Sequence, residues 1–174
     1  MRTALRKAAT VTAAALAAAT VATATHDASA ATAATPTCRT QDLRASLTDS
    51  GHQIGMSHQG TLLRLTNASS HSCALRGYPG LQLEDAGHRP LTTNTHWGST
   101  YFAPDPGKKT LILGPGRSVE ADLVWAHADA PVMVEATYLE ITPPASTSHL
   151  TVPFQQIVTN GDLSVTALAY RIDV

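Results

Sequence analysis

The sequence predicts an all-β protein: an immunoglobulin-like antiparallel β-sandwich of about eight or nine strands with one disulfide. Three observations predict this fold. Apolar residues recur at every second position in short runs, turn residues separate the runs, and helical periodicity is almost absent. A closed barrel is the alternative architecture for such a pattern.

The alternating runs define the expected strands. The run from Val119 to Trp125 is the clearest, because its apolar residues alternate with Glu120 and Asp122, which favours one buried and one solvated face. In chain order the runs lie at residues 43–47, 63–65, 81–83, 111–114, 119–125, 133–142, 150–158 and 162–172.

The dipeptide Asn160-Gly161 separates the last two runs. Asn-Gly between alternating segments is a strong hairpin signal, because both positions of a tight turn need a left-handed backbone. The sequence therefore predicts that residues 150–158 and 162–172 pair as a hairpin.

Residues 1–30 have the parts of a secretory signal peptide. Three basic residues lie in the first seven positions, an Ala/Thr/Val stretch follows, and Ala28 and Ala30 offer a small-residue cleavage site. A retained membrane helix is the alternative, but a stretch thinned by threonine inserts poorly into hydrocarbon. We expect export with cleavage near Ala30, a flexible Ala/Thr segment at 31–37, one domain over 38–174 and no further transmembrane segment.

The charge balance excludes one class of partner. Without residues 1–30 the chain has nine basic and twelve acidic side chains, and the basic ones do not cluster. Nucleic-acid binding needs a basic face, so none is expected. The remaining length suits a single domain, which we expect to be a monomer.

The chain has two cysteines, Cys38 and Cys73. In an exported protein two thiols favour a disulfide over a metal half-site or a catalytic pair. The spacing also excludes C-x-x-C redox chemistry. We therefore expect a Cys38–Cys73 disulfide.

The segment from 96 to 109, HWGSTYFAPDPGKK, is the longest turn-rich region. Its aromatic residues Trp97, Tyr101 and Phe102 form the candidate binding loop, because clustered loop aromatics stack on sugars or anchor partner proteins. The competing interpretation is that these rings fold back and cover one end of the sandwich.

Other candidate chemistry is weaker. GMSHQG at 55–60 is a near miss for the G-x-S-x-G nucleophile motif, and Asn67-Ala68-Ser69 matches a glycosylation sequon. No histidine pair has a metal-ligand spacing, and we expect most histidines in solvated turns. After residue 30 the histidines are His52, His58, His71, His88, His96, His127 and His149. No metal, cofactor or catalytic residue is predicted.

Four stretches of the chain resemble an actinobacterial family, domain of unknown function 4232. They are CRTQDL, LLRLTNASSHSCALRGYPGLQLED, LGPGRSVEADLVW and LEITPPASTSHLTVPF, in this order. The resemblance covers roughly residues 38–170. It implies a secreted or lipid-anchored β-sandwich with disulfides and no established activity, and it supplies no catalytic residues. Cys38 and Cys73 match a family cysteine pair. A second pair, common in members, is replaced here near Glu135-Ala136 and Val158.

Together these features predict a secreted, non-catalytic module that interacts with an extracellular or cell-envelope partner, either a protein or a glycan. The alternative is an enzyme of the cell envelope, a hydrolase or a metal-dependent enzyme, with a site assembled from dispersed His and Asp/Glu side chains.

Overall fold

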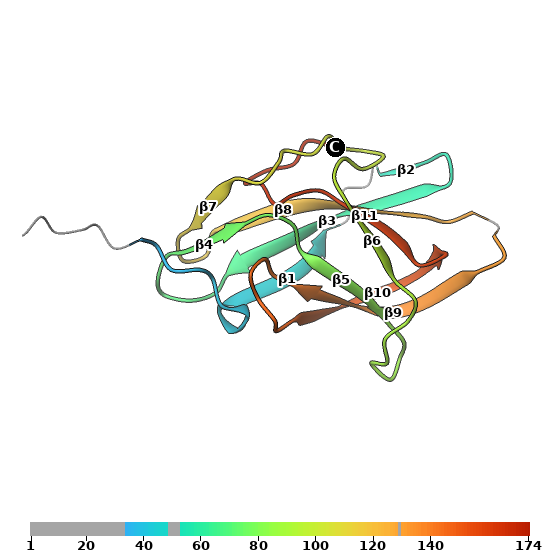
Figure 1. The fold of residues 1–174 in the computed structure, drawn as a ribbon, viewed down its shortest axis with the longest axis horizontal. Helices are drawn as coiled ribbons and strands as arrows, with labels where there is room; N and C mark the ends of the chain where they lie inside the picture. The colour runs from blue at the N-terminus through green and yellow to red at the C-terminus, as the bar shows by residue number, and fades with distance from the viewer. Residues whose placement is uncertain (1–33, 49–52, 129) are drawn as a thin grey trace, which may run out of the picture. The chain divides into compact units, whose positions relative to one another are not determined.

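The computed structural model describes residues 34–48, 53–128 and 130–174 (Figure 1). The predicted signal peptide, its cleavage site near Ala30, residues 31–33 and His52 lie outside this part of the chain. Within the segment predicted to be flexible, Thr37 forms a bridge with Ala74, and the N–H of Ala74 donates to the carbonyl oxygen of Pro36 (2.8 Å). Pairing with the rest of the fold therefore begins before Cys38.

The described residues form eleven strands and one short 3₁₀ helix, η1 (Thr40–Asp42). The strands are β1 (Leu43–Thr48), β2 (Ile54–Gly55), β3 (His58–Asn67), β4 (Cys73–Arg76), β5 (Gly80–Glu84), β6 (Asn94–Trp97), β7 (Thr110–Leu113), β8 (Ser118–Ala126), β9 (Met133–Thr142), β10 (Leu150–Thr159) and β11 (Asp162–Val165). Each long alternating run of the sequence lies in one of them. The short strands β2, β4 and β6 carry too few alternating residues to be recognised beforehand.

Two main sheets build the sandwich. One has the order β1-β3-β8-β11-β6, with β2 added beside β3, and the other has the order β10-β9-β5. A separate pair, β4 with β7, lies beside them (Figure 1). The pairings are antiparallel except between β11 and β6. The predicted immunoglobulin-like β-sandwich is confirmed. No helix among the described residues has the length and apolarity needed to cross a membrane.

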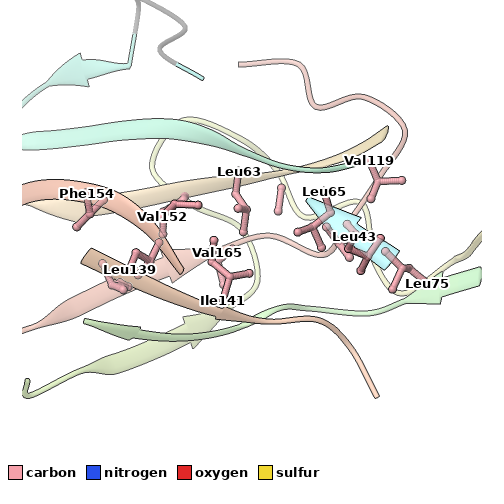
Figure 2. Close-up of a cluster of buried hydrophobic side chains, with 14 of the residues drawn as sticks. Leu43, Leu63, Leu65, Leu75, Val119, Leu139, Ile141, Val152, Phe154 and Val165 are labelled. Carbon is pink, nitrogen blue, oxygen red and sulfur yellow. The ribbon is translucent and has the colours of Figure 1, made fainter. Parts of the chain in front are cut away.

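The core lies between the two main sheets. Leu63 and Leu65 of β3 face Leu139 and Ile141 of β9, as Figure 2 shows, and these side chains are fully buried. The inward positions of β8 are buried as predicted, from Val119 to Trp125. Burial of this apolar layer is the main source of stability in a sandwich of this kind.

The predicted hairpin at Asn160-Gly161 is wrong. The turn forms, with φ of 54° at Asn160 and 74° at Gly161, but β10 pairs with β9, whereas β11 pairs with β8 and β6 in the other sheet. A Cβ at Gly161 would lie 2.1 Å from the carbonyl oxygen of Thr92. The glycine therefore permits a close crossing between the sheets. The predicted strand at 162–172 is also too long, because β11 ends at Val165.

The disulfide joins Cys38 to Cys73, as predicted. Both residues are buried, and the N–H of Cys38 donates to the carbonyl oxygen of Ala74 (3.0 Å). The bond therefore holds the segment before η1 against β4. A buried structural disulfide is typical of oxidising compartments.

Replacing both cysteines, Cys38→Ser with Cys73→Ser, should lower the free energy of unfolding by roughly 3–4 kcal/mol. The bond closes a loop with a sequence separation of 35 residues, which restricts the unfolded chain. Urea denaturation of the two proteins measures the difference. A change below about 1 kcal/mol would mean that the disulfide adds little to the packing around it.

Asn67, at the end of β3, is completely buried and holds a turn together. Its Nδ2 donates to the carbonyl oxygens of His71 (2.8 Å) and Leu113 (2.9 Å), and its Oδ1 accepts from the N–H and hydroxyl of Ser69. All of its amide groups are used inside the protein. The sequon Asn67-Ala68-Ser69 is therefore closed to glycosylation in the folded state.

Asn67→Ala should lower the free energy of unfolding by about 2–4 kcal/mol, because it removes a buried hydrogen bond to the Leu113 carbonyl oxygen and partly buried bonds to His71 and Ser69. The matched control is Asn94→Ala. The amide of Asn94 also donates twice, to the Asn160 carbonyl oxygen and to Asp162, but at exposed positions. Equal losses for the two variants in urea denaturation would contradict the role assigned to Asn67.

Candidate functional site

The predicted binding loop spans the end of β6 and the whole connection to β7. Its three aromatic residues differ in exposure. Trp97 is 62% exposed and Tyr101 is 51% exposed, whereas Phe102 is partly buried. The two interpretations of the loop therefore apply to different rings.

Phe102 covers the sheet. It meets the ring of Tyr101 edge-on, with centroids 5.0 Å apart. A Cβ added to Gly60 on β3 would lie 3.1 Å from Phe102 Cδ2, so the ring lies close against the backbone of the strand. Phe102 acts as cover, as the competing interpretation holds.

Tyr101 stacks on His58, the first residue of β3, with ring centroids 4.3 Å apart and planes 5° from parallel. His58 follows the turn at Met56 and Ser57, whose φ values of 50° and 63° are left-handed. The Met56 side chain is 81% exposed, and its carbonyl oxygen lies 2.9 Å from His58 Nδ1. Non-glycine residues rarely adopt this conformation, so the turn that precedes His58 exposes the Met56 side chain at some conformational cost. Sequence reasoning missed Met56, although GMSH marked a turn.

Trp97 lies against a second group of side chains. Its Nε1 donates to the carbonyl oxygen of Pro79 (3.1 Å), and its ring centroid is 6.3 Å from that of Tyr78. The amine of Lys108 lies 5.4 Å from the Tyr78 centroid, within cation–π range. Trp97 is therefore held at one point while most of its ring faces solvent.

The hydroxyl of Tyr78 bonds to a side chain of the loop. The hydroxyl donates to Asp105 Oδ2 (2.6 Å), a charge-assisted bond that a carboxylate accepts better than a peptide carbonyl does. This bond, then burial, then the negative charge of Asp105 raise the pKa of Tyr78.

Asp105 ties the far end of the loop to the chain beyond β11. Its Oδ1 accepts from the N–H of Ala167 (2.9 Å), and its own N–H donates to the Ser99 hydroxyl (3.0 Å). Partial burial alone would raise the pKa of Asp105. Hydrogen bonds from Tyr78 and from the N–H groups of Ala167 and Gly107 outweigh burial and lower the pKa below its ordinary value.

Asp122 holds the near end of the loop. The sequence placed it on a polar strand face, but it is completely buried, because the loop covers the outer side of β8. Its carboxylate accepts hydrogen bonds from the Thr100 hydroxyl and from Gln53 Nε2, and its N–H donates to the Thr166 hydroxyl (2.9 Å). Burial raises the pKa of Asp122, and the bonds from Thr100 and Gln53 offset only part of this rise. One carboxylate thus joins the loop, β8 and the residue before β2.

Among the described residues, the dispersed histidines do not converge into one cluster. The nearest to one is a shallow groove of about 270 Å³, which includes His58, His96, Asp162 and Ser164. His96 Nε2 lies 3.5 Å from Asp162 Oδ1, and Ser164 is the strand partner of His96. Within the described ranges no three His, Cys, Asp or Glu residues are placed to hold one metal ion.

The near miss GMSHQG adds no nucleophile. It forms the turn between β2 and β3, and it lacks the strand-to-helix geometry of a nucleophile elbow.

The two aspartates that anchor the loop should have opposite effects on stability as pH changes. Asp122 has a raised folded-state pKa, so its protonation stabilises the fold fully below the unfolded value of about 3.9, and this stabilisation is lost as pH rises through the folded pKa. Asp122→Asn should therefore be increasingly more stable than wild type as pH rises. Asp105 has a lowered pKa, so its stabilisation is present above the unfolded value and is lost as pH falls through the folded pKa.

The matched variant Asp105→Asn should accordingly be less stable than wild type at neutral pH, with the gap closing in acid. Urea denaturation from pH 3 to 8 of both variants measures these profiles. Parallel profiles for Asp122→Asn and wild type would contradict the role of buried Asp122.

Comparison with known proteins gives one finding. A family model described as "Domain of unknown function (DUF4232)" matches residues 38–169, which include both cysteines, the whole loop and all of the strands. No curated protein matches the sequence.

Proposed function

Because the chain belongs to the DUF4232 family, a domain of unknown function, we propose its role from its own residues: a secreted, non-catalytic binding module. The exposed rings of Trp97 and Tyr101 make up the binding surface, which we call the aromatic surface. The partner is a protein of the cell envelope or the medium.

One observation carries the proposal. The loop is anchored at both ends by buried or half-buried carboxylates, yet Trp97 and Tyr101 stay more than half exposed. A loop that served only as cover would bury its large rings. Rigid, exposed aromatic side chains lose little conformational entropy on binding, which makes them common anchors of protein interfaces.

Secretion is supported by the basic and apolar N-terminal segment together with the buried disulfide. The absence of a catalytic role is supported by the histidines. Four of them pair separately with carboxylates: His71 with Asp42, His88 with Glu84, His96 with Asp162 and His149 with Glu140. Dispersed pairs on the surface lack the converging nucleophile, base and oxyanion donors that a hydrolase needs.

The test is capture of a partner by the full-length exported protein from envelope and medium fractions of the producing cell. The double variant Trp97→Ala with Tyr101→Ala should recover at least about tenfold less partner than wild type, because anchoring aromatic side chains are removed. Its melting temperature should stay close to that of wild type, because both rings are largely exposed.

The matched control is Ile112→Ala on β7, an exposed apolar side chain outside the 96–109 loop. It should capture as wild type does. Undiminished capture by the double variant contradicts the proposal. So does a large fall in its melting temperature that accounts for the lost capture, since the rings would then be cover.

A further inference from the structure

A second feature lies at the sandwich end where β3, β8 and β10 meet, and none of the aromatic loop lines it. It is a pocket of about 330 Å³, walled by Trp125 and Phe154, whose rings meet edge to face with centroids 4.9 Å apart. The volume is at the lower end for small-molecule sites.

One residue of the pocket wall, Trp125, has a polar atom without a hydrogen-bond partner. Trp125 is 5% exposed, and its Nε1 is the one buried side-chain nitrogen or oxygen in the described residues without a hydrogen-bond partner. A buried indole N–H nearly always has an acceptor, because an unmade bond at such a donor is unfavourable. This nitrogen has less than 1 Å² of accessible surface, so a ligand in the pocket would meet the face of the Trp125 ring and not its N–H.

The polar residues around Trp125 break the inward pattern of their strands. Gln59 is the strand partner of Trp125, and Gln156 is the strand partner of buried Ala136, so both sit at core-facing positions. Across the described part of the chain, neither carboxamide bonds to another protein group. Polar residues at core-facing positions without partners are expected where function overrides packing.

A bulge in β10 places Gln156 there. The register between β10 and β9 shifts between Pro153 and Gln156, and Gln155 has a left-handed φ of 48°. Such bulges redirect side chains and are common beside binding sites. Pro153, Phe154 and Gln156 all line the pocket.

The chemistry of the wall selects the ligand. No charged side chain of the described residues lines the pocket, so an ionic ligand would lose its hydration without gaining a counter-charge. A purely apolar ligand would leave the carboxamides of Gln59 and Gln156 unpaired. A neutral sugar ring has hydroxyl groups that accept and donate, and a C–H face that packs on aromatic rings.

We propose that this pocket binds one uncharged pyranose unit, with its hydroxyl groups paired with the carboxamides of Gln59 and Gln156. The Trp125 and Phe154 rings hold its C–H face. The site is separate from the aromatic surface and does not depend on it.

Nuclear magnetic resonance tests the assignment directly. The protein has two tryptophans, so Trp97→Phe identifies the Trp125 indole signal in ¹⁵N-labelled full-length protein. Titration with methyl β-glucoside and with the methyl glycoside of N-acetylglucosamine should shift that signal saturably with at least one sugar. Which of the two binds more tightly identifies the sugar type. Galacturonate and cyclohexylmethanol, a charged and an apolar ring, should not shift it.

Substitutions in the pocket distinguish specific sugar binding from non-specific binding. Gln59→Leu and Gln156→Leu should each raise the sugar dissociation constant about tenfold, the loss of roughly one hydrogen bond. Gln41→Leu, the same change at an exposed residue elsewhere, should leave it unchanged. The proposal is overturned by no saturable shift with either sugar, by a shift with only the charged or apolar ring, or by unchanged affinity in both pocket variants while they remain folded.

Discussion

The buried carboxylate of Asp122 is the interaction on which the arrangement of the candidate surface depends. The buried carboxyl group is tolerated on the outer side of β8 because Thr100 and Gln53 donate to it from segments far apart in the chain. The same bonds hold the loop across the strand. Burial of Asp122 and the position of the loop therefore depend on the same hydrogen bonds. Tyr101 directly follows Thr100, which makes one of these bonds.

Buried or partly buried polar side chains occur at several points of the fold. Asn67 closes the turn before β4, Asp105 joins the loop to the chain after β11, and each has its hydrogen bonds made by the protein. Trp125 is different, because its N–H lacks a partner among the described residues. An unsatisfied buried donor is unfavourable, so Trp125 departs from the rule that the other buried polar groups follow.

Much of the fold could be predicted because the alternation of buried and exposed positions along a strand is visible in the local sequence. Strand β9 has the predicted bounds, since each of its residues has a fixed face and the Pro143-Pro144 pair ends it. The failure at Asn160-Gly161 has an equally physical reason. The dipeptide determines the backbone of the turn, whereas the strand that pairs next is chosen by which sheet can bury Leu163 and Val165. The candidate loop was found from its aromatics, but Met56 and Asp122 were not, because neither has a local signal.

The sequence by itself determined the β-class, the positions of the long strands and the two cysteines that pair. Alternation is a local property of each strand, and two cysteines allow only one intramolecular disulfide. Only the tertiary structure decided which face of β8 a loop would cover, which ring of that loop would be buried, and where polar side chains would meet Trp125. Those outcomes depend on contacts between segments distant in the chain. Covering both faces of a strand is a property of the assembled fold, and an alternating pattern describes only one strand at a time.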